Sequence, residues 1–440
     1  MKYKVLVIVL LFFMLNLYSQ KNIVSVNRSE YGMKLVVDGA DFMINGMNWD
    51  YVPIGKNYEY SLWKQSDELI KAALDAEMSL LKNMGVNTIR VYTGMQPKWI
   101  TYVYETYGIY TMLNHTFGRY GLTINGVWTP VTEYDDPKTR NLLLSEVTAM
   151  SKEYKDTPGL LLFLLGNENN YGLFWAGAET EDFPEEDEKK KFIGESRGRP
   201  MYKLMNDAAI KMKSINNNLP IAICNGDLLF AEIIAEECKD VDIYGTNMYR
   251  GKSFTDAFER VKKELDMPIL FTEFGADAFN VISNKEDQEM QAFYMVENWK
   301  EIYQNAAGLG KSGNAIGGFT FQFSDGWWKY GQTKNLDVHD NNASWFNRGY
   351  NLDIDGNNNN NNNNMNEEWF GVCAKGPTNS KGLYTLYPRA AYFALQEVHH
   401  INPFLKEMNL TVISEHFKKI RLKKHVLKAK EQMANLLKNE

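Results

Sequence analysis

The chain has 440 residues, of which 44% are hydrophobic, so it is long enough for two or three average domains or for one large barrel. Its net charge of −7 leaves no basic surplus for a nucleic-acid footprint. The three cysteines, Cys224, Cys238 and Cys373, are widely spaced and form no CxxC pair, so they indicate neither a disulfide framework nor a metal site. We expect them to be small buried apolar side chains.

The first 20 residues have the pattern of a secretory signal peptide. Lys2 and Lys4 precede an apolar run over Val5–Leu17, and Tyr18-Ser19-Gln20 follows. The run is short for a permanent membrane span. We therefore predict export to the periplasm, the cell surface or the medium. An uncleaved anchor is the alternative, because the usual Ala-x-Ala cleavage motif is missing.

Residues 32–37 and 41–45 flank the turn signal Asp38-Gly39 and predict a small β-hairpin after the signal peptide. Short apolar segments then recur and predict eight strands, over Phe42–Met47, Val86–Tyr92, Ile109–Leu113, Leu160–Leu165, Ile221–Cys224, Val241–Tyr244, Pro268–Thr272 and Gly317–Phe323. Segments with helical spacing separate most of them, over Ser66–Met84, Asn141–Lys155, Tyr202–Ile215, Leu228–Cys238, Ser253–Leu265 and Asp287–Asn305, and a last helix is predicted over Arg389–His399. This alternation predicts an α/β fold, a closed (β/α)8 TIM barrel with long insertions in the βα loops.

The predicted catalytic domain covers residues 21–404, and a basic helical tail covers residues 405–440. Within the tail, residues 417–430 hold seven Lys or Arg and no acidic residue. We interpret the tail as a solvated helix outside the barrel, with peripheral contact to an anionic envelope surface as the alternative. No GxGxxG or GxxxxGKS motif follows any predicted strand, which disfavours nucleotide binding.

Two glutamates follow strongly apolar strands. Glu168 comes after Leu160–Leu165 in the sequence Gly-Asn-Glu, and Glu273 comes directly after Pro268–Thr272. Barrel enzymes carry their chemistry at the C-terminal ends of the strands, where a lone buried carboxylate would otherwise be costly. Two carboxyl groups on one rim can provide the acid and the nucleophile of glycoside hydrolysis. The alternative is that each glutamate only pairs with an arginine such as Arg90.

The pair Asn167-Glu168 after strand four, with Glu273 at the end of strand seven, resembles clan A of the retaining glycoside hydrolases. The resemblance spans about residues 45–403. Four stretches resemble fungal and yeast β-1,3-glucanosyltransferases: GVNTIRVY (85–92), GNE (166–168), VDIYGTNMY (241–249) and PILFTEFG (268–275). The stretch YPRAAYFALQEV (387–398) is similar to the closing helix of the family that contains β-galactosidases and β-mannosidases. The disulfide cysteines and the Cys-rich module of the transferases are missing, so the pattern indicates the clan rather than one family.

The resemblance implies a role for each matching residue. Glu168 would be the general acid/base and Glu273 the nucleophile. Asn167 would bind the 2-hydroxyl of the sugar. Arg90, at the end of strand two, would orient the nucleophile and keep it ionised, and Tyr249 would hydrogen-bond it.

Several other side chains are candidates for lining sugar subsites at the mouth of the barrel, with core packing or loop anchoring as the alternative. They are Tyr92, His115, Gln322 and Trp327, together with Trp175 and Trp328.

These features predict retaining hydrolysis of β-glycosidic bonds in a polysaccharide or oligosaccharide, with β-glucan or β-mannan as the first candidates. The reaction needs no metal and no cofactor. A β-glucan transglycosylase is one alternative. A non-catalytic carbohydrate-binding barrel is another, but it would not need both glutamates. The sequence does not indicate the sugar, the linkage, endo or exo action, or the oligomeric state.

Overall fold

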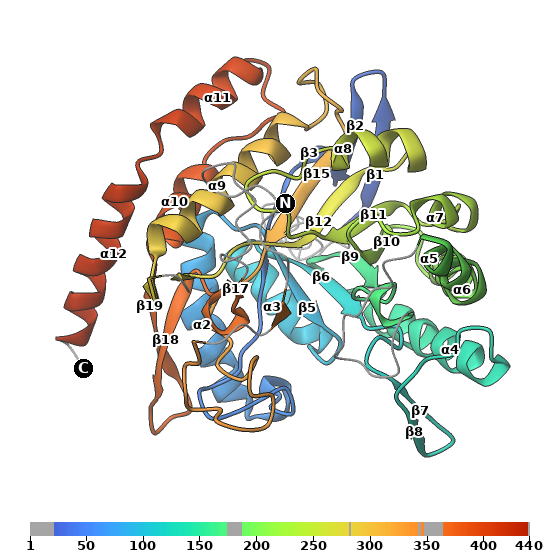
Figure 1. Ribbon diagram of the computed structural model, residues 1–440, viewed down its shortest axis with the longest axis horizontal. Coiled ribbons are helices and arrows are strands. Elements are labelled where there is room, and N and C mark those ends of the chain that lie inside the picture. The colour runs from blue at the N-terminus through green and yellow to red at the C-terminus, as the bar shows by residue number, and fades with distance from the viewer. Residues whose placement is uncertain (1–21, 174–186, 281–282, 342–344, 347–363, 439–440) are drawn as a thin grey trace, which may run out of the picture.

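The computed structural model describes residues 22–173, 187–280, 283–341, 345–346 and 364–438 (Figure 1). The predicted signal peptide and Trp175 lie outside these residues. Eight parallel strands close into a barrel, in the order β10-β11-β12-β15-β4-β5-β6-β9. In chain order these strands are β4 (Ile44–Asn48), β5 (Thr88–Tyr92), β6 (Tyr110–His115), β9 (Leu160–Leu165), β10 (Ile221–Gly226), β11 (Ile243–Asn247), β12 (Ile269–Phe274) and β15 (Ala315–Thr320). The predicted (β/α)8 barrel is confirmed.

The barrel closes where the last strand meets the first. β15 pairs with β4 in parallel, with Gly317 opposite Ile44. At this seam Gly317 has φ +128°, and a Cβ there would lie 2.2 Å from the backbone oxygen of Ile44. A larger residue would therefore separate the two strands, so glycine is required at this position.

Helices follow the strands and surround the barrel (Figure 1). They are α2 (Asp67–Met84), α3 (Pro97–Tyr107), α4 (Pro137–Tyr154), α5 (Asp187–Ile193), α6 (Arg199–Lys213), α7 (Ala231–Glu237), α8 (Ala257–Arg260), α9 (Gln288–Gln304) and α10 (Ala390–Val398). Helix α3 was not predicted from the sequence, although Pro97 occupies its first turn and Gly108 ends it in the left-handed conformation. The side chains of Trp99, Ile100 and Val103 anchor this helix in the core.

Seven of the eight predicted strands begin or end one to three residues away from the observed ones, and two of these differences matter for the fold. The apolar run at Phe42–Met47 belongs to two elements, because β3 (Ala40–Phe42) completes an antiparallel sheet with β1 (Val24–Ser29) and β2 (Gly32–Val37) before β4 begins. The last barrel strand ends at Thr320, so Phe321 to Phe323 form a loop at the mouth. Short antiparallel pairs decorate the loops: β7 (Leu122–Ile124) with β8 (Val127–Thr129), β13 (Phe279–Asn280) with β14 (Lys285–Glu286), β16 (Trp345–Phe346) with β17 (Asn364–Met365), and β18 (Cys373–Thr378) with β19 (Tyr384–Pro388).

The C-terminal tail is helical and packs on the outside of the barrel helices. It forms α11 (Leu410–Lys419) and α12 (Leu422–Leu437), which lie along α9 and α10 (Figure 1). Ile413 and Phe417 are buried in the main hydrophobic core, and the ring of Phe417 lies 6.0 Å from that of Tyr303 on α9. One face of the tail is therefore anchored to the barrel, while its lysines face solvent.

All three cysteines are free and buried, as expected. In the part of the chain that the structure describes, no helix combines the length and the apolar character needed to cross a membrane.

Candidate active site

The two candidate glutamates lie at the C-terminal ends of barrel strands four and seven. Glu273 is part of β12 and is buried, whereas Glu168 follows β9 by three residues and is partly exposed. The backbone of Glu168 has φ +56°, and its N–H donates to the carbonyl of Cys224 on β10 at 3.0 Å. A left-handed non-glycine residue is uncommon and is found mainly where surrounding contacts impose it, often at functional sites.

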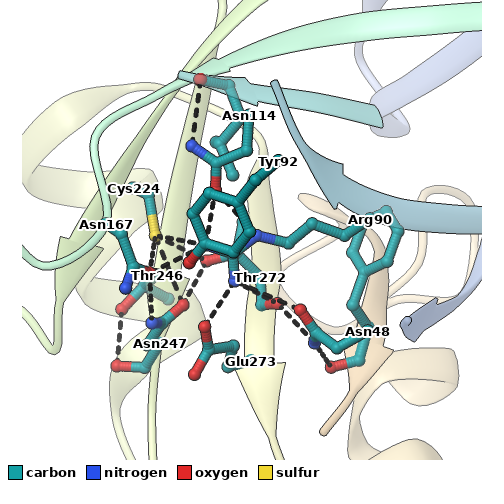
Figure 2. Close-up of polar contacts among 12 residues, drawn as sticks. Asn48, Arg90, Tyr92, Asn114, Asn167, Cys224, Thr246, Asn247, Thr272 and Glu273 are labelled. Atoms are coloured by element: carbon teal, nitrogen blue, oxygen red, sulfur yellow. Dashed lines mark hydrogen bonds and ion pairs between the residues drawn. The ribbon is translucent and has the colours of Figure 1, made fainter. Parts of the chain in front are cut away.

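Arg90 on β5 connects Glu273 to the rest of the mouth (Figure 2). Its Nη1 lies 2.5 Å from Glu273 Oε1, and both side chains are buried. Nε and Nη2 donate to Asn114 Oδ1 at 2.9 and 2.6 Å, and Nη2 also donates to Asn167 Oδ1 at 2.7 Å. One guanidinium thus joins β5, β6, the end of β9 and β12 by charge-assisted hydrogen bonds.

The second oxygen of Glu273 is held by Tyr249. The Tyr249 hydroxyl donates to Glu273 Oε2 at 3.2 Å. Burial, and next the charge of Glu273, raise the pKa of Tyr249 well above its ordinary value, so the phenol keeps its proton and remains a donor. With Arg90 on one oxygen and Tyr249 on the other, the orientation of the Glu273 carboxylate is fixed.

Asparagines at strand ends form a polar floor beneath these groups, which the sequence analysis did not predict. Asn48 ends β4, Asn247 ends β11, and Asn114 is the penultimate residue of β6. Asn48 Nδ2 donates to the carbonyl of Thr272 at 3.0 Å, and Asn114 Nδ2 donates to that of Gly166 at 2.8 Å. The signal in the sequence was an asparagine at or near the end of an apolar strand.

Cys224 lies in the same floor. Its Sγ is 3.3 Å from Asn247 Oδ1 and 3.2 Å from Thr272 Oγ1. Burial raises the pKa of this thiol to about 11, so it is neutral at ordinary pH. Among the described residues, no group of three His, Cys, Asp or Glu side chains is arranged to hold a metal ion.

The structure brings only some of the further candidates to this cluster. Tyr92 is at the rim, and its hydroxyl accepts from Arg90 Nη2 at 3.4 Å. Gln322 is buried, and its Nε2 has no hydrogen-bond partner in the described part of the chain. His115 is directed elsewhere, because its Nδ1 accepts from the backbone of Phe117 at 3.1 Å and its Nε2 lies 3.4 Å from Glu146 on α4.

The tryptophan candidates are partly covered. The Trp327 ring stacks on His339 at 4.6 Å, and His339 stacks in turn on Trp369 at 3.7 Å. Trp328 lies under the Lys329 ammonium at 4.7 Å. Phe321, which was not among the candidates, meets the ring of Tyr249 edge-on, with 6.5 Å between centroids. The sequence places Phe321 inside the predicted strand Gly317–Phe323, so it was not predicted to lie at the mouth.

No protein-family model and no curated protein sequence matches the chain. Solved structures do resemble it. The GH2 β-galacturonidase from Eisenbergiella tayi, bound to galacturonate, matches with a TM-score of 0.51 and 14% identity over 86% of this chain and 54% of its own. The β-glucuronidase from Ruminococcus gnavus, in complex with a C6-substituted uronic isofagomine, matches with 0.50 and 14% over 86% and 53%. Gas2p from Saccharomyces cerevisiae, in complex with laminaripentaose, matches with 0.49 and 17% over 92% and 70%.

The chain thus spans about half the length of the galacturonidase and glucuronidase chains that it matches. At 14% identity the likeness shows the fold alone. The chain has the barrel fold of these glycosidases, as its resemblance to clan A implied.

Proposed function

We propose that the chain hydrolyses β-glycosidic bonds in a polysaccharide or oligosaccharide with net retention, with Glu273 as nucleophile and Glu168 as general acid/base. The observation that carries this proposal is the way Glu273 is held. Arg90 binds one carboxylate oxygen at 2.5 Å and Tyr249 donates to the other at 3.2 Å. A carboxylate with fixed orientation at the mouth of a barrel is suited to attack an anomeric carbon.

The surroundings of Glu168 suit the complementary role. It is more exposed than Glu273 and lies on the same rim, after β9, with β10 and β11 between β9 and β12. A carboxylic acid there donates a proton to the leaving oxygen in the first step. In the second step the resulting carboxylate removes a proton from the attacking water. Two carboxyl groups in different surroundings can thus divide the acid and nucleophile roles.

Asn167 is the candidate for binding the sugar itself. Arg90 donates to its Oδ1, which leaves the Nδ2 end directed toward Tyr120, whose hydroxyl lies 2.9 Å away. Tyr120 is 42% exposed, so the partner of this amide end is accessible to a ligand. An N–H at this position can donate to a sugar hydroxyl next to the reacting carbon.

A substrate screen with product analysis tests the proposal. The purified chain and its Glu273→Gln variant are assayed on aryl β-glycosides and on β-glucan, β-mannan and other β-linked polysaccharides. We expect turnover by the wild type, loss of at least three orders of magnitude in the variant, and a β-anomer as the first product in proton NMR. Products longer than the substrate would indicate transfer to sugar instead of water. Absence of turnover on every β-linked substrate, or equal activity of both proteins, would reject the proposed function.

A further inference from the structure

A chain of hydrogen bonds links Thr272 on β12 to Asn247 on β11 and then to Asn167, the residue before Glu168 (Figure 2). Thr272 Oγ1 donates to Asn247 Oδ1 at 2.7 Å, and Asn247 Nδ2 donates to Asn167 Oδ1 at 3.1 Å. Thr272, Asn247 and Asn167 are all buried. Thr272 directly precedes Glu273, and Asn167 directly precedes Glu168, so the chain connects the backbone positions of both candidate catalytic residues.

The direction of every bond in this chain follows from Arg90. A guanidinium has only donors, so Asn167 must present its oxygen to Arg90 Nη2, 2.7 Å away. Asn247 must then present its nitrogen to the same oxygen, because two amide oxygens at 3.1 Å would repel each other. The oxygen of Asn247 is thereby directed toward the hydroxyl of Thr272 and the thiol of Cys224, both of which can donate to it.

We propose that Asn247, itself held by the hydroxyl of Thr272, is a positioning residue that fixes the amide of Asn167 for binding a sugar hydroxyl. This inference rests on the proposed function. Without Asn247, the oxygen of Asn167 would be held by Arg90 and by the weak thiol donor of Cys224 at 3.7 Å, and its Nδ2 end by the partly exposed Tyr120. The amide donor of Asn247 adds a stronger contact to this oxygen from the side of β11 and keeps the Nδ2 end directed toward Tyr120. Catalysis is sensitive to such small displacements of groups that hold the substrate.

The neighbouring strand offers a matched control. Thr246 and Thr272 are both threonines with no exposed surface, one on β11 and one on β12. The Thr246 hydroxyl lies near the backbone carbonyls of Asp227 and Asn247, at 3.3 and 3.4 Å, and not in the chain to Asn167. Thr272→Val and Thr246→Val therefore each remove one buried hydroxyl at equal volume, but only the first removes the donor to the Asn247 side chain. Thr272→Ser keeps that donor.

The test compares two substrates that differ in one hydroxyl. These are the nitrophenyl β-glycoside that the wild type hydrolyses fastest and its 2-deoxy analogue. We expect Asn247→Ala and Thr272→Val to lower kcat/KM on the first by about tenfold, the effect of one hydrogen bond, and on the second by less than about threefold. Thr272→Ser should restore most of the loss, and Thr246→Val should change neither value by more than about twofold.

The possible outcomes separate the inference from the function on which it rests. Equal losses of kcat/KM on both substrates would show that Asn247 and Thr272 only maintain the fold. No loss of kcat/KM on either substrate would show that Asn167 does not depend on them. Either result overturns the positioning role. A wild type that turns over no aryl β-glycoside and no β-linked oligosaccharide or polysaccharide would overturn the proposed function itself. Thermal unfolding of each variant verifies that the compared proteins are folded, and Thr272→Val keeps the test decisive if Asn247→Ala does not fold.

Discussion

The guanidinium of Arg90 is out of contact with water, so its N–H groups need protein acceptors. It finds them on Glu273, Asn114 and Asn167, which come from three different segments of the barrel. Lysine could not replace it, because one ammonium lacks the planar fork that reaches all three. Arg90 therefore determines the orientation of the Glu273 carboxylate. Through Asn167 it also determines the direction of the hydrogen bond between the amides of Asn247 and Asn167.

Some of these residues could be predicted from the sequence and others could not. Glu273 directly follows a predicted apolar strand, where a charge has no use in the core, so it was found as a functional candidate. Arg90 was found through the resemblance to clan A. Asn114 and Asn247 were missed because a single asparagine in an apolar strand does not reveal its partners. His115 was predicted at the mouth from its place after a strand, but a side chain at a strand end can also turn outward, and His115 contacts Glu146 on α4.

His399, the residue after α10, gives a prediction about pH. It is buried edge-on against Trp299, with 4.6 Å between ring centroids, and neither ring nitrogen has a hydrogen-bond partner among the described residues. Burial, with a smaller effect of His400, lowers the pKa of His399 from 6.5 to about 3. Below pH 6.5 the unfolded chain therefore binds a proton at His399, whereas the folded chain binds it only as the pH approaches 3. The free energy of unfolding therefore falls as the pH drops from 6.5 toward 3.

We expect this histidine to remove about 2 kcal/mol of stability between pH 7 and pH 5. Urea unfolding of the wild type and of His399→Leu at both pH values measures it. Between pH 7 and pH 5, His399→Leu should lose about 2 kcal/mol less stability than the wild type. His400→Gln, at an exposed position, should lose as much stability as the wild type. Parallel pH dependence of the wild type and His399→Leu would show that His399 titrates normally in the folded protein.

The barrel strands were the elements most readily predicted from the sequence, because a parallel strand covered on both sides is a continuous apolar run. The run Leu160–Leu165 is buried throughout and has the predicted bounds. Boundaries were less predictable where two elements share one run, as at β3 and β4. The helix α3 was missed because its tyrosines also favour strands, and tertiary packing of Ile100 and Val103 decides between the two.

The tail helices give a prediction at this scale. Phe417 on α11 is buried against Tyr303, whereas Val412 on the same helix is 41% exposed. Phe417→Ala should destabilise the protein by about 3–5 kcal/mol, as in other cores, and Val412→Ala by no more than about 0.5 kcal/mol. Removal of residues 410–440 should destabilise the protein further, because the buried contacts of Ile413 and Ala429 with the barrel are also lost.

At a temperature where Phe417→Ala is folded, its kcat should match that of the wild type, because α11 packs on the outer side of α9 while the candidate site lies at the strand ends. Chemical unfolding and initial rates on one soluble substrate provide both measurements. Equal destabilisation by the two alanine variants would show that the tail is not anchored through Phe417. A loss of kcat in the folded variant would show that the tail contributes to the site.

For the molecule as a whole, closure of the barrel is what brings distant residues together. Arg90 and Glu273 are 183 residues apart in the chain, yet parallel strands of one barrel place both at the same end. The order of apolar strands therefore predicted the fold and the general place of the site. It could not predict the substrate, because subsites are built by the loops after the strands, where rings such as Trp327 and Phe321 take positions that depend on their neighbours.

The measurement that most directly tests the roles of the two glutamates is azide rescue, in which the anomeric form of the product is determined for each alanine variant. With a nitrophenyl β-glycoside the leaving group needs no proton, so Glu168→Ala should still form the covalent intermediate, and azide should release it as the β-glycosyl azide. Glu273→Ala lacks the nucleophile, so azide should attack the opposite face and yield the α-glycosyl azide. Full activity of either variant without azide, or an inverted product from the wild type, would contradict the assignment of Glu273 as nucleophile and Glu168 as acid/base.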